Sequence, residues 1–159
     1  MTTKVMCVTA AALSFGISLF AADVSVGTWK LNLEKSTYSP ELPPMSSIIV
    51  IEPSGDNGVK VSVETINAKG AKIRIAYSAN FDGKEYPFSQ SGPGAAANQT
   101  VAFKQIDPQT VERTNYVDGK PAGKESWVVS KDGKVRTVTQ TGMTSDGKPI
   151  HNVLVQDRR

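Results

Sequence analysis

The fold of this chain is decided by the stretch Gly27-Thr28-Trp29-Lys30-Leu31-Asn32-Leu33. Glycine and tryptophan open the stretch, and apolar residues then alternate with polar ones. A period of two is typical of a β-strand that buries one of its faces. The segment therefore predicts the first strand of an antiparallel sheet.

The same alternation returns along the rest of the chain. Asp-Gly pairs separate several of the strand-like segments, at 82–83, 118–119, 132–133 and 146–147. Asp-Gly supplies the positive φ angles that tight hairpin turns require. Helical periodicity is absent after the N-terminal region, and a meander of many short strands can close and remove its exposed edges. We expect an all-β chain that forms a single antiparallel up-and-down β-barrel of about eight to ten strands, lipocalin-like, with little helix.

Three interruptions of the pattern predict loops or weak strands. Glu34 to Pro44 contains three prolines, which are excluded from helix interiors and central strands. Glu85 to Phe88 contains Pro87 and predicts a short, edge-like piece, because proline cannot donate to a ladder. Ser89 to Asn98 is rich in glycine and alanine, and we expect a loop at the barrel mouth that is able to act as a lid.

The N-terminus has the features of a secretory signal peptide. Lys4 precedes an apolar run that ends at Ala21-Ala22, so we expect cleavage of residues 1–22 and a barrel domain over 23–159. The alternative is a membrane anchor, but the run is shorter than the roughly 20 residues that span a bilayer. We therefore expect an exported protein, periplasmic or extracellular, without a stable membrane anchor. Because Cys7 lies in the signal segment, the mature chain has no disulfide or thiolate chemistry.

Composition argues against several function classes. The chain has 159 residues and a net charge of +3, and its lysines and arginines are spread evenly, so nucleic acid is not an expected partner. His151 is the single histidine, and no cysteines or clustered carboxylates accompany it in the mature chain, so no metal or cofactor is expected. No nucleophile-elbow motif accompanies it either, which favours a strand residue at the barrel rim over a catalytic base.

The later strands differ from the earlier ones because both of their faces carry polar residues. Arg113, Tyr116 and Arg136 are the sharpest binding candidates, since a guanidinium inside an apolar barrel needs an anionic partner such as a ligand carboxylate. The alternative is that these faces point at solvent and that surface carboxylates neutralise the arginines. Tyr77, Phe103 and Trp127 are ordinary core aromatics or pocket-lining residues.

Three functions are compatible with this pattern. The first is binding of a small hydrophobic or amphipathic molecule in the barrel interior, the expected partner of the protein. The second is a secreted protein-interaction or inhibitor module with a filled barrel. The third is a cavity-based isomerase or hydrolase that depends on His151 or Arg113, so enzymatic activity stays open.

The chain resembles the lipocalin-like (calycin) superfamily, and within it exported bacterial proteins with no known ligand. Three segments in this order carry the resemblance over the whole mature chain: Gly27 to Asn32 with Lys35-Ser36 and Ser39-Pro40, Asn80 to Pro87, and Val129 to Lys134. The usual disulfide and the long C-terminal helix of larger lipocalins are missing from the sequence.

The resemblance implies a structural plug at the closed end of the barrel. In lipocalins the tryptophan of the Gly-x-Trp element fills that end, and a basic residue near the last strand packs over it. Gly27 and Trp29 match the first element, and Arg158 matches the second by position.

Overall fold

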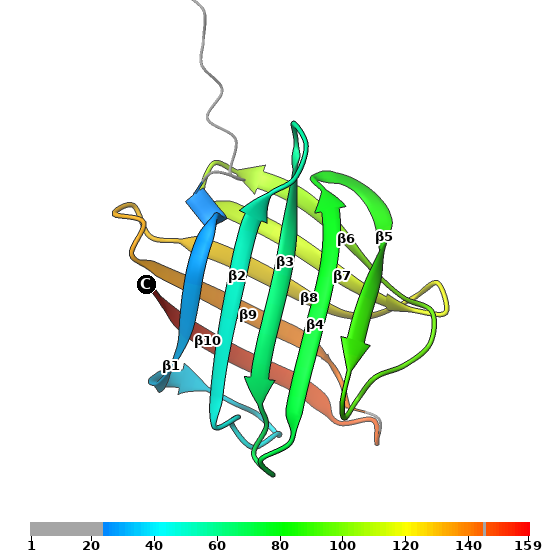
Figure 1. Ribbon diagram of the computed structural model, residues 1–159. Coiled ribbons are helices and arrows are strands. Elements are labelled where there is room, and N and C mark those ends of the chain that lie inside the picture. The colour runs from blue at the N-terminus through cyan, green and yellow to red at the C-terminus, as the bar shows by residue number, and fades with distance from the viewer. Residues whose placement is uncertain (1–23, 145) are drawn as a thin grey trace, which may run out of the picture.

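The computed structural model describes residues 24–144 and 146–159, which form ten strands (Figure 1). The expected signal peptide, with Cys7, lies outside the described residues. The strands are β1 (Gly27–Thr37), β2 (Ser46–Pro53), β3 (Gly58–Ile66), β4 (Lys72–Asn80), β5 (Asp82–Ser91), β6 (Gln99–Asp107), β7 (Thr110–Val117), β8 (Lys120–Val129), β9 (Val135–Met143) and β10 (Pro149–Arg158).

The ten strands form one closed barrel in which each strand pairs with its neighbours in sequence. The first strand closes the sheet, because β1 pairs antiparallel with β2 on one side and with β10 on the other. All pairs are antiparallel, and the helical part of the described chain is a turn at 24–25. The predicted all-β, up-and-down barrel is confirmed.

The predicted loop after the first strand begins later than expected. β1 continues to Thr37, and its pairing with β10 shifts register between Asn32 and Thr37. Pairing to the C-terminal strand therefore extends the strand beyond the point where local sequence would end it. The loop itself covers 38–45.

The predicted edge-like piece around Pro87 is in fact part of a ten-residue strand, β5. β5 pairs with β6 through its first part, up to Pro87, and with β4 through its last part, from Phe88 to Ser91. Pro87 therefore has a hydrogen-bonded neighbour on one side, which tolerates its missing N–H. The loop at the barrel mouth shortens accordingly to 92–98.

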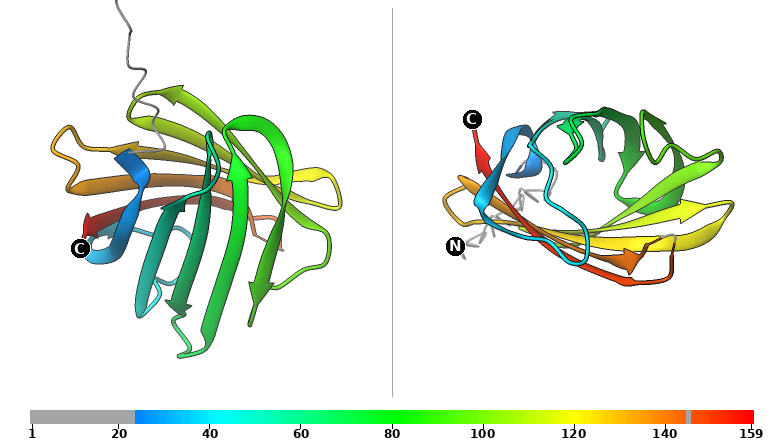
Figure 2. Two further views of the ribbon diagram at one scale, coloured as in Figure 1. Left: turned by 45° about the horizontal axis from the view of Figure 1, so that its top comes forward. Right: turned by 90° about the horizontal axis from the view of Figure 1, so that it is seen from below.

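The two ends of the barrel differ. The N-terminal turn and the C-terminus lie at one end, where the core cluster includes Trp29, Ile51, Val59, Phe103 and Val129. The loops 38–45, 67–71 and 92–98 lie at the other end, and Figure 2, right, looks into it with the 38–45 loop across part of the opening. No helix of the described residues is long and apolar enough to cross a membrane.

Candidate functional site

A cavity of about 1080 Å³ extends from the mouth loops into the barrel. This volume is in the range of pockets that hold small molecules. Tyr38, Leu42 and Pro93 line it at the mouth, and Trp127 and Arg136 line it in the interior. The interior is therefore not filled by side chains, and this contradicts the premise of a filled-barrel interaction module.

The cavity has one apolar wall. β2, β3 and β4 contribute it through side chains that alternate inward along each strand, namely Ile49, Val61, Val63, Ile73 and Ile75. We call these five residues the apolar wall. Their polar neighbours in sequence, such as Ser62 and Arg74, lie on the outer face.

The opposite side of the cavity is polar. Strands β7 to β10 contribute most of its charged and amide side chains, among them Arg113, Glu125, Arg136, Gln140, Asn152 and Gln156. We call these six residues the polar wall. Five of them are at most 8% exposed, namely Arg113, Glu125, Asn152, Gln156 and Arg136, and Arg136 is the most buried at 1%. Burial of this kind is costly unless each group finds a partner.

Arg113 and Glu125 form a buried ion pair across the β7–β8 hairpin. Arg113 Nη1 donates to Glu125 Oε1 at 3.0 Å. Burial is the largest single influence and opposes the charge on each group, but the charge of the partner and the hydrogen bonds together outweigh it, so the pKa of Glu125 is lowered and that of Arg113 is raised. Both groups are therefore ionised at neutral pH.

Glu125 is also the start of a hydrogen-bonded chain that reaches the mouth. Its carboxylate accepts from Trp127 Nε1 at 2.8 Å and from Gln140 Nε2 at 3.1 Å. Asn152 Nδ2 donates to Gln140 Oε1 at 3.3 Å, and the backbone N–H of Ser39 donates to Asn152 Oδ1 at 3.0 Å. The mouth loop is thus linked to the buried ion pair through side chains of the polar wall.

Arg136 lies deeper and has no such partner. Its Nε donates to the neutral Gln156 Oε1 at 2.6 Å, and its guanidinium lies 4.7 Å from the ring centre of Trp127 and 5.1 Å from that of Trp29. Among the described residues, no carboxylate lies within ion-pairing distance of it. Burial lowers the pKa of Arg136 to about 10, which still leaves the group charged at neutral pH.

Within residues 24–144 and 146–159, five buried side-chain atoms lack a hydrogen-bond partner. All five belong to residues that line the cavity. They are Arg113 Nε, Arg136 Nη1, Asn115 Oδ1, Gln99 Oε1 and the Tyr38 hydroxyl. Because buried polar groups are almost always paired in folded proteins, this concentration makes the cavity the candidate functional site.

Five of the six sequence candidates line this cavity, whereas Phe103 is fully buried behind it and the prediction that it contacts a ligand is wrong. Arg113 and Arg136 are in the polar wall, and Tyr77, Phe103 and Trp127 are buried side by side, with Phe103 5.7 Å from Tyr77 and 5.2 Å from Trp127 between ring centres. Arg113 also lies 5.0 Å from the Tyr77 ring centre. Tyr116 is half-buried near the mouth and lines the cavity next to a register shift in β7.

The polar wall also contains four residues that were not predicted as site residues from the sequence: Glu125, Gln140, Asn152 and Gln156. Gln140 lies on the same face of β9 as the predicted residue Arg136, because the two are four positions apart in a strand. Thr137 and Thr139 of β9 alternate with these inward residues and lie on the outer face, whereas Thr141 lines the cavity. Alternation in the sequence shows which residues share a face of the strand, but it does not show which of the two faces is inside the barrel.

His151 lies away from the cavity. Its side chain is exposed on β10, while its backbone N–H donates to Ser39 O at 2.9 Å. His151 is therefore not placed to act as the catalytic base of a cavity-based enzyme. In the described part of the chain, no group of three His, Cys, Asp or Glu side chains is arranged to hold a metal ion.

Gly27, Trp29 and Arg158 come together at the end opposite the mouth. The Arg158 guanidinium lies 4.3 Å from the Trp29 ring centre and donates to three backbone carbonyls, those of Val24, Val26 and Gly133. Trp29 Nε1 donates to Ser25 O at 2.8 Å. A Cβ on Gly27, whose φ is +139°, would lie 2.6 Å from Arg158 Nη1, so the close approach of the guanidinium requires glycine.

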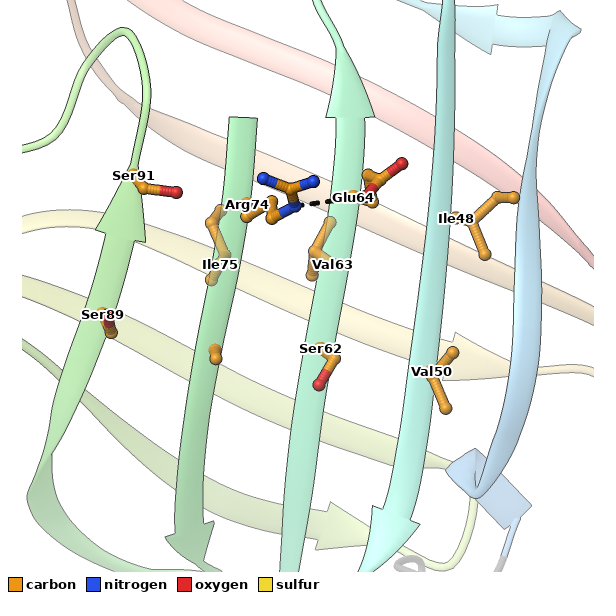
Figure 3. A pocket seen from close by; sticks show the side chains of 10 residues that line it. Ile48, Val50, Ser62, Val63, Glu64, Arg74, Ile75, Ser89 and Ser91 are labelled. Carbon is orange, nitrogen blue, oxygen red and sulfur yellow. Dashed lines mark hydrogen bonds and ion pairs between the residues drawn. The ribbon is translucent and has the colours of Figure 1, made fainter. Parts of the chain in front are cut away.

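A second hollow, of about 320 Å³, lies on the outer face of β2 to β5 (Figure 3). Ile48 and Val50 border it on one side and Ser89 and Ser91 on the other. Its carboxylate, Glu64, accepts from Arg74 Nε at 3.3 Å and from Lys72 Nζ at 2.9 Å. The charges here are paired and exposed, in contrast to those of the cavity.

No family model and no curated protein matches this chain. Among solved structures it is similar to a redesigned beta barrel, with 15% identity and a TM-score of 0.47 over 87% of this chain and 95% of the other. It is also similar to a redesigned beta barrel, mFAP1, bound to DFHBI, with 13% identity and a TM-score of 0.45 over 87% and 98% of the two chains. Neither likeness identifies a family for this chain.

Proposed function

We propose that the barrel binds a small amphipathic molecule in its interior cavity. The observation that carries the proposal is that all five unpartnered buried polar atoms of the described residues line one open cavity. A ligand with an apolar body and a few polar groups would cover the apolar wall and pair with atoms of the polar wall.

The proposal includes export and a lipocalin-like relation. The N-terminal sequence supports export, and the packing of Arg158 over Trp29 supports the relation. In this proposal Gly27, Trp29 and Arg158 form the structural plug, while ligand specificity belongs to the polar wall, which extends inward as far as Arg136 beside Trp29.

The test is native mass spectrometry of the purified protein after incubation with a bacterial lipid extract. We expect a retained species of small mass in the unaltered protein. Val63→Trp places an indole in the cavity and abolishes retention, whereas Val50→Trp, on the neighbouring strand but on the outer face, leaves it unchanged. Circular dichroism confirms that both variants are folded. Absence of any retained species in the unaltered protein would overturn the proposal.

A further inference from the structure

The charges buried in the cavity do not balance. Arg113 and Arg136 are both buried there, and Glu125 is the one buried carboxylate among the described residues. Lys69, Lys124 and Glu41 also line the cavity, but they are exposed to water at its mouth. The interior therefore carries one excess positive charge, and an uncompensated buried charge is strongly unfavourable.

The free donors of the two guanidiniums point to the type of group that compensates this charge. Arg136 uses Nε for Gln156 and keeps Nη1 free, while Arg113 uses Nη1 for Glu125 and keeps Nε free. A planar guanidinium with several donors matches the geometry of a carboxylate. Both arginines contact the same aromatic cluster, Arg136 through Trp127 and Arg113 through Tyr77, and both line the same cavity.

Resting on the proposed function, we infer that the ligand is an amphiphile with a single negative charge, a long-chain carboxylic acid, whose carboxylate binds Arg136 with Arg113 as a second donor. One carboxylate neutralises the excess charge of the interior. A phosphate monoester carries about −1.5 to −2 at neutral pH and exceeds it. The acid enters with its charged group innermost, and its chain extends along the apolar wall toward the mouth.

The experiment measures binding of four ligands of equal chain length to the delipidated protein by isothermal titration calorimetry at neutral pH. The ligands are dodecanoic acid, dodecan-1-ol, dodecylamine and dodecyl phosphate, each below its critical micelle concentration. We expect the acid to bind most tightly, about 10- to 100-fold better than the alcohol, which is the range of a charge-assisted hydrogen bond.

Two substitutions assign the effect to Arg136. Arg136→Met lowers the affinity for the acid to that for the alcohol and leaves the alcohol unchanged. Arg136→Lys keeps the charge without the planar fork, so it is expected to give an intermediate affinity and also serves if the methionine variant does not fold. Arg74→Met, which removes an arginine from the outer face, is the matched control and leaves all four affinities unchanged.

The outcomes separate the inference from the proposed function. Binding of none of the four ligands overturns both. Equal binding of acid and alcohol, or tighter binding of the amine or the phosphate than of the acid, overturns the single-anion inference while interior binding stands. An acid preference that survives both Arg136 substitutions overturns the assignment to Arg136.

Discussion

The apolar wall and the polar wall are built from strands of similar length with the same alternation of inward and outward side chains, yet their side chains have opposite requirements for stable burial. Ile49 and Val61 on the apolar wall need no specific partner, and contact with any apolar surface stabilises them. Glu125 and Arg136 on the polar wall each require particular atoms at particular places. The stability of the apolar wall therefore depends on the total area of contact, and that of the polar wall on the placement of individual atoms.

The largest effect that tests this contrast is expected from Glu125→Ala. It leaves Arg113 buried without its carboxylate and removes the acceptor of Trp127 and Gln140, so we expect a loss of about 3–5 kcal/mol in the free energy of unfolding. Urea denaturation followed by circular dichroism measures it.

The double variant Arg113→Met, Glu125→Leu is the control for this prediction. It removes both charges together, so most of the lost stability is expected to return. A single variant that costs less than about 1 kcal/mol would mean that the pair is not buried as the structure shows it.

A smaller effect is expected on the apolar wall from Ile49→Ala. Ile49 is 5% exposed, and its truncation is expected to cost about 2 kcal/mol, the low end for such residues, because its inner side already borders a cavity. Ile48→Ala, at the neighbouring outward position that is 39% exposed, is expected to change stability by less than about 0.5 kcal/mol. Equal costs in the same urea experiment would contradict the assignment of the inner face.

The smallest effect is expected in the dependence of the free energy of unfolding on acidic pH, because the prediction concerns a single carboxyl group, that of Glu125. The folded pKa of Glu125 is lowered from 4.5, so its contribution to stability is present above that value and is lost as the pH falls toward the lower folded pKa. Glu125→Gln is expected to reduce the dependence of stability on pH in this range.

Glu64→Gln, on the outer face, serves as the matched comparison for the acid response. Its carboxyl group also has a lowered pKa, caused first by the hydrogen bond from Lys72, but its side chain is exposed on the surface. Urea midpoints across the acid range compare the two variants. A larger change for Glu64→Gln than for Glu125→Gln would reverse the expected ranking of the two faces.

The barrel was predictable from the sequence because its determinants are local. Alternation marks each strand, and Asp118-Gly119 and Asp132-Gly133 mark hairpin turns that the structure contains. Closure follows because a long meander leaves no other partner for its two edges. The extension of β1 to Thr37 was not predictable, since it depends on pairing with a strand more than a hundred residues away.

The ion pair of the polar wall shows why the site was harder to predict than the fold. Val117 pairs with Lys120 across the turn, and an unbroken ladder from there would place Arg113 opposite Lys124. The structure has a register shift between Asn115 and Tyr116, which moves the pairing by one residue and places Arg113 opposite Glu125. A shift of this kind exchanges inward and outward partners, and nothing in the local sequence marks it.

The position of Trp127 allows tryptophan fluorescence to report on the cavity. The chain has two tryptophans, and Trp127 lines the cavity while Trp29 is fully buried under Arg158. The indole of Trp127 donates to the Glu125 carboxylate and lies against the Arg136 guanidinium, so its emission responds to any change of charge or water around these groups. In a Trp29→Phe variant, the whole tryptophan signal would come from the cavity.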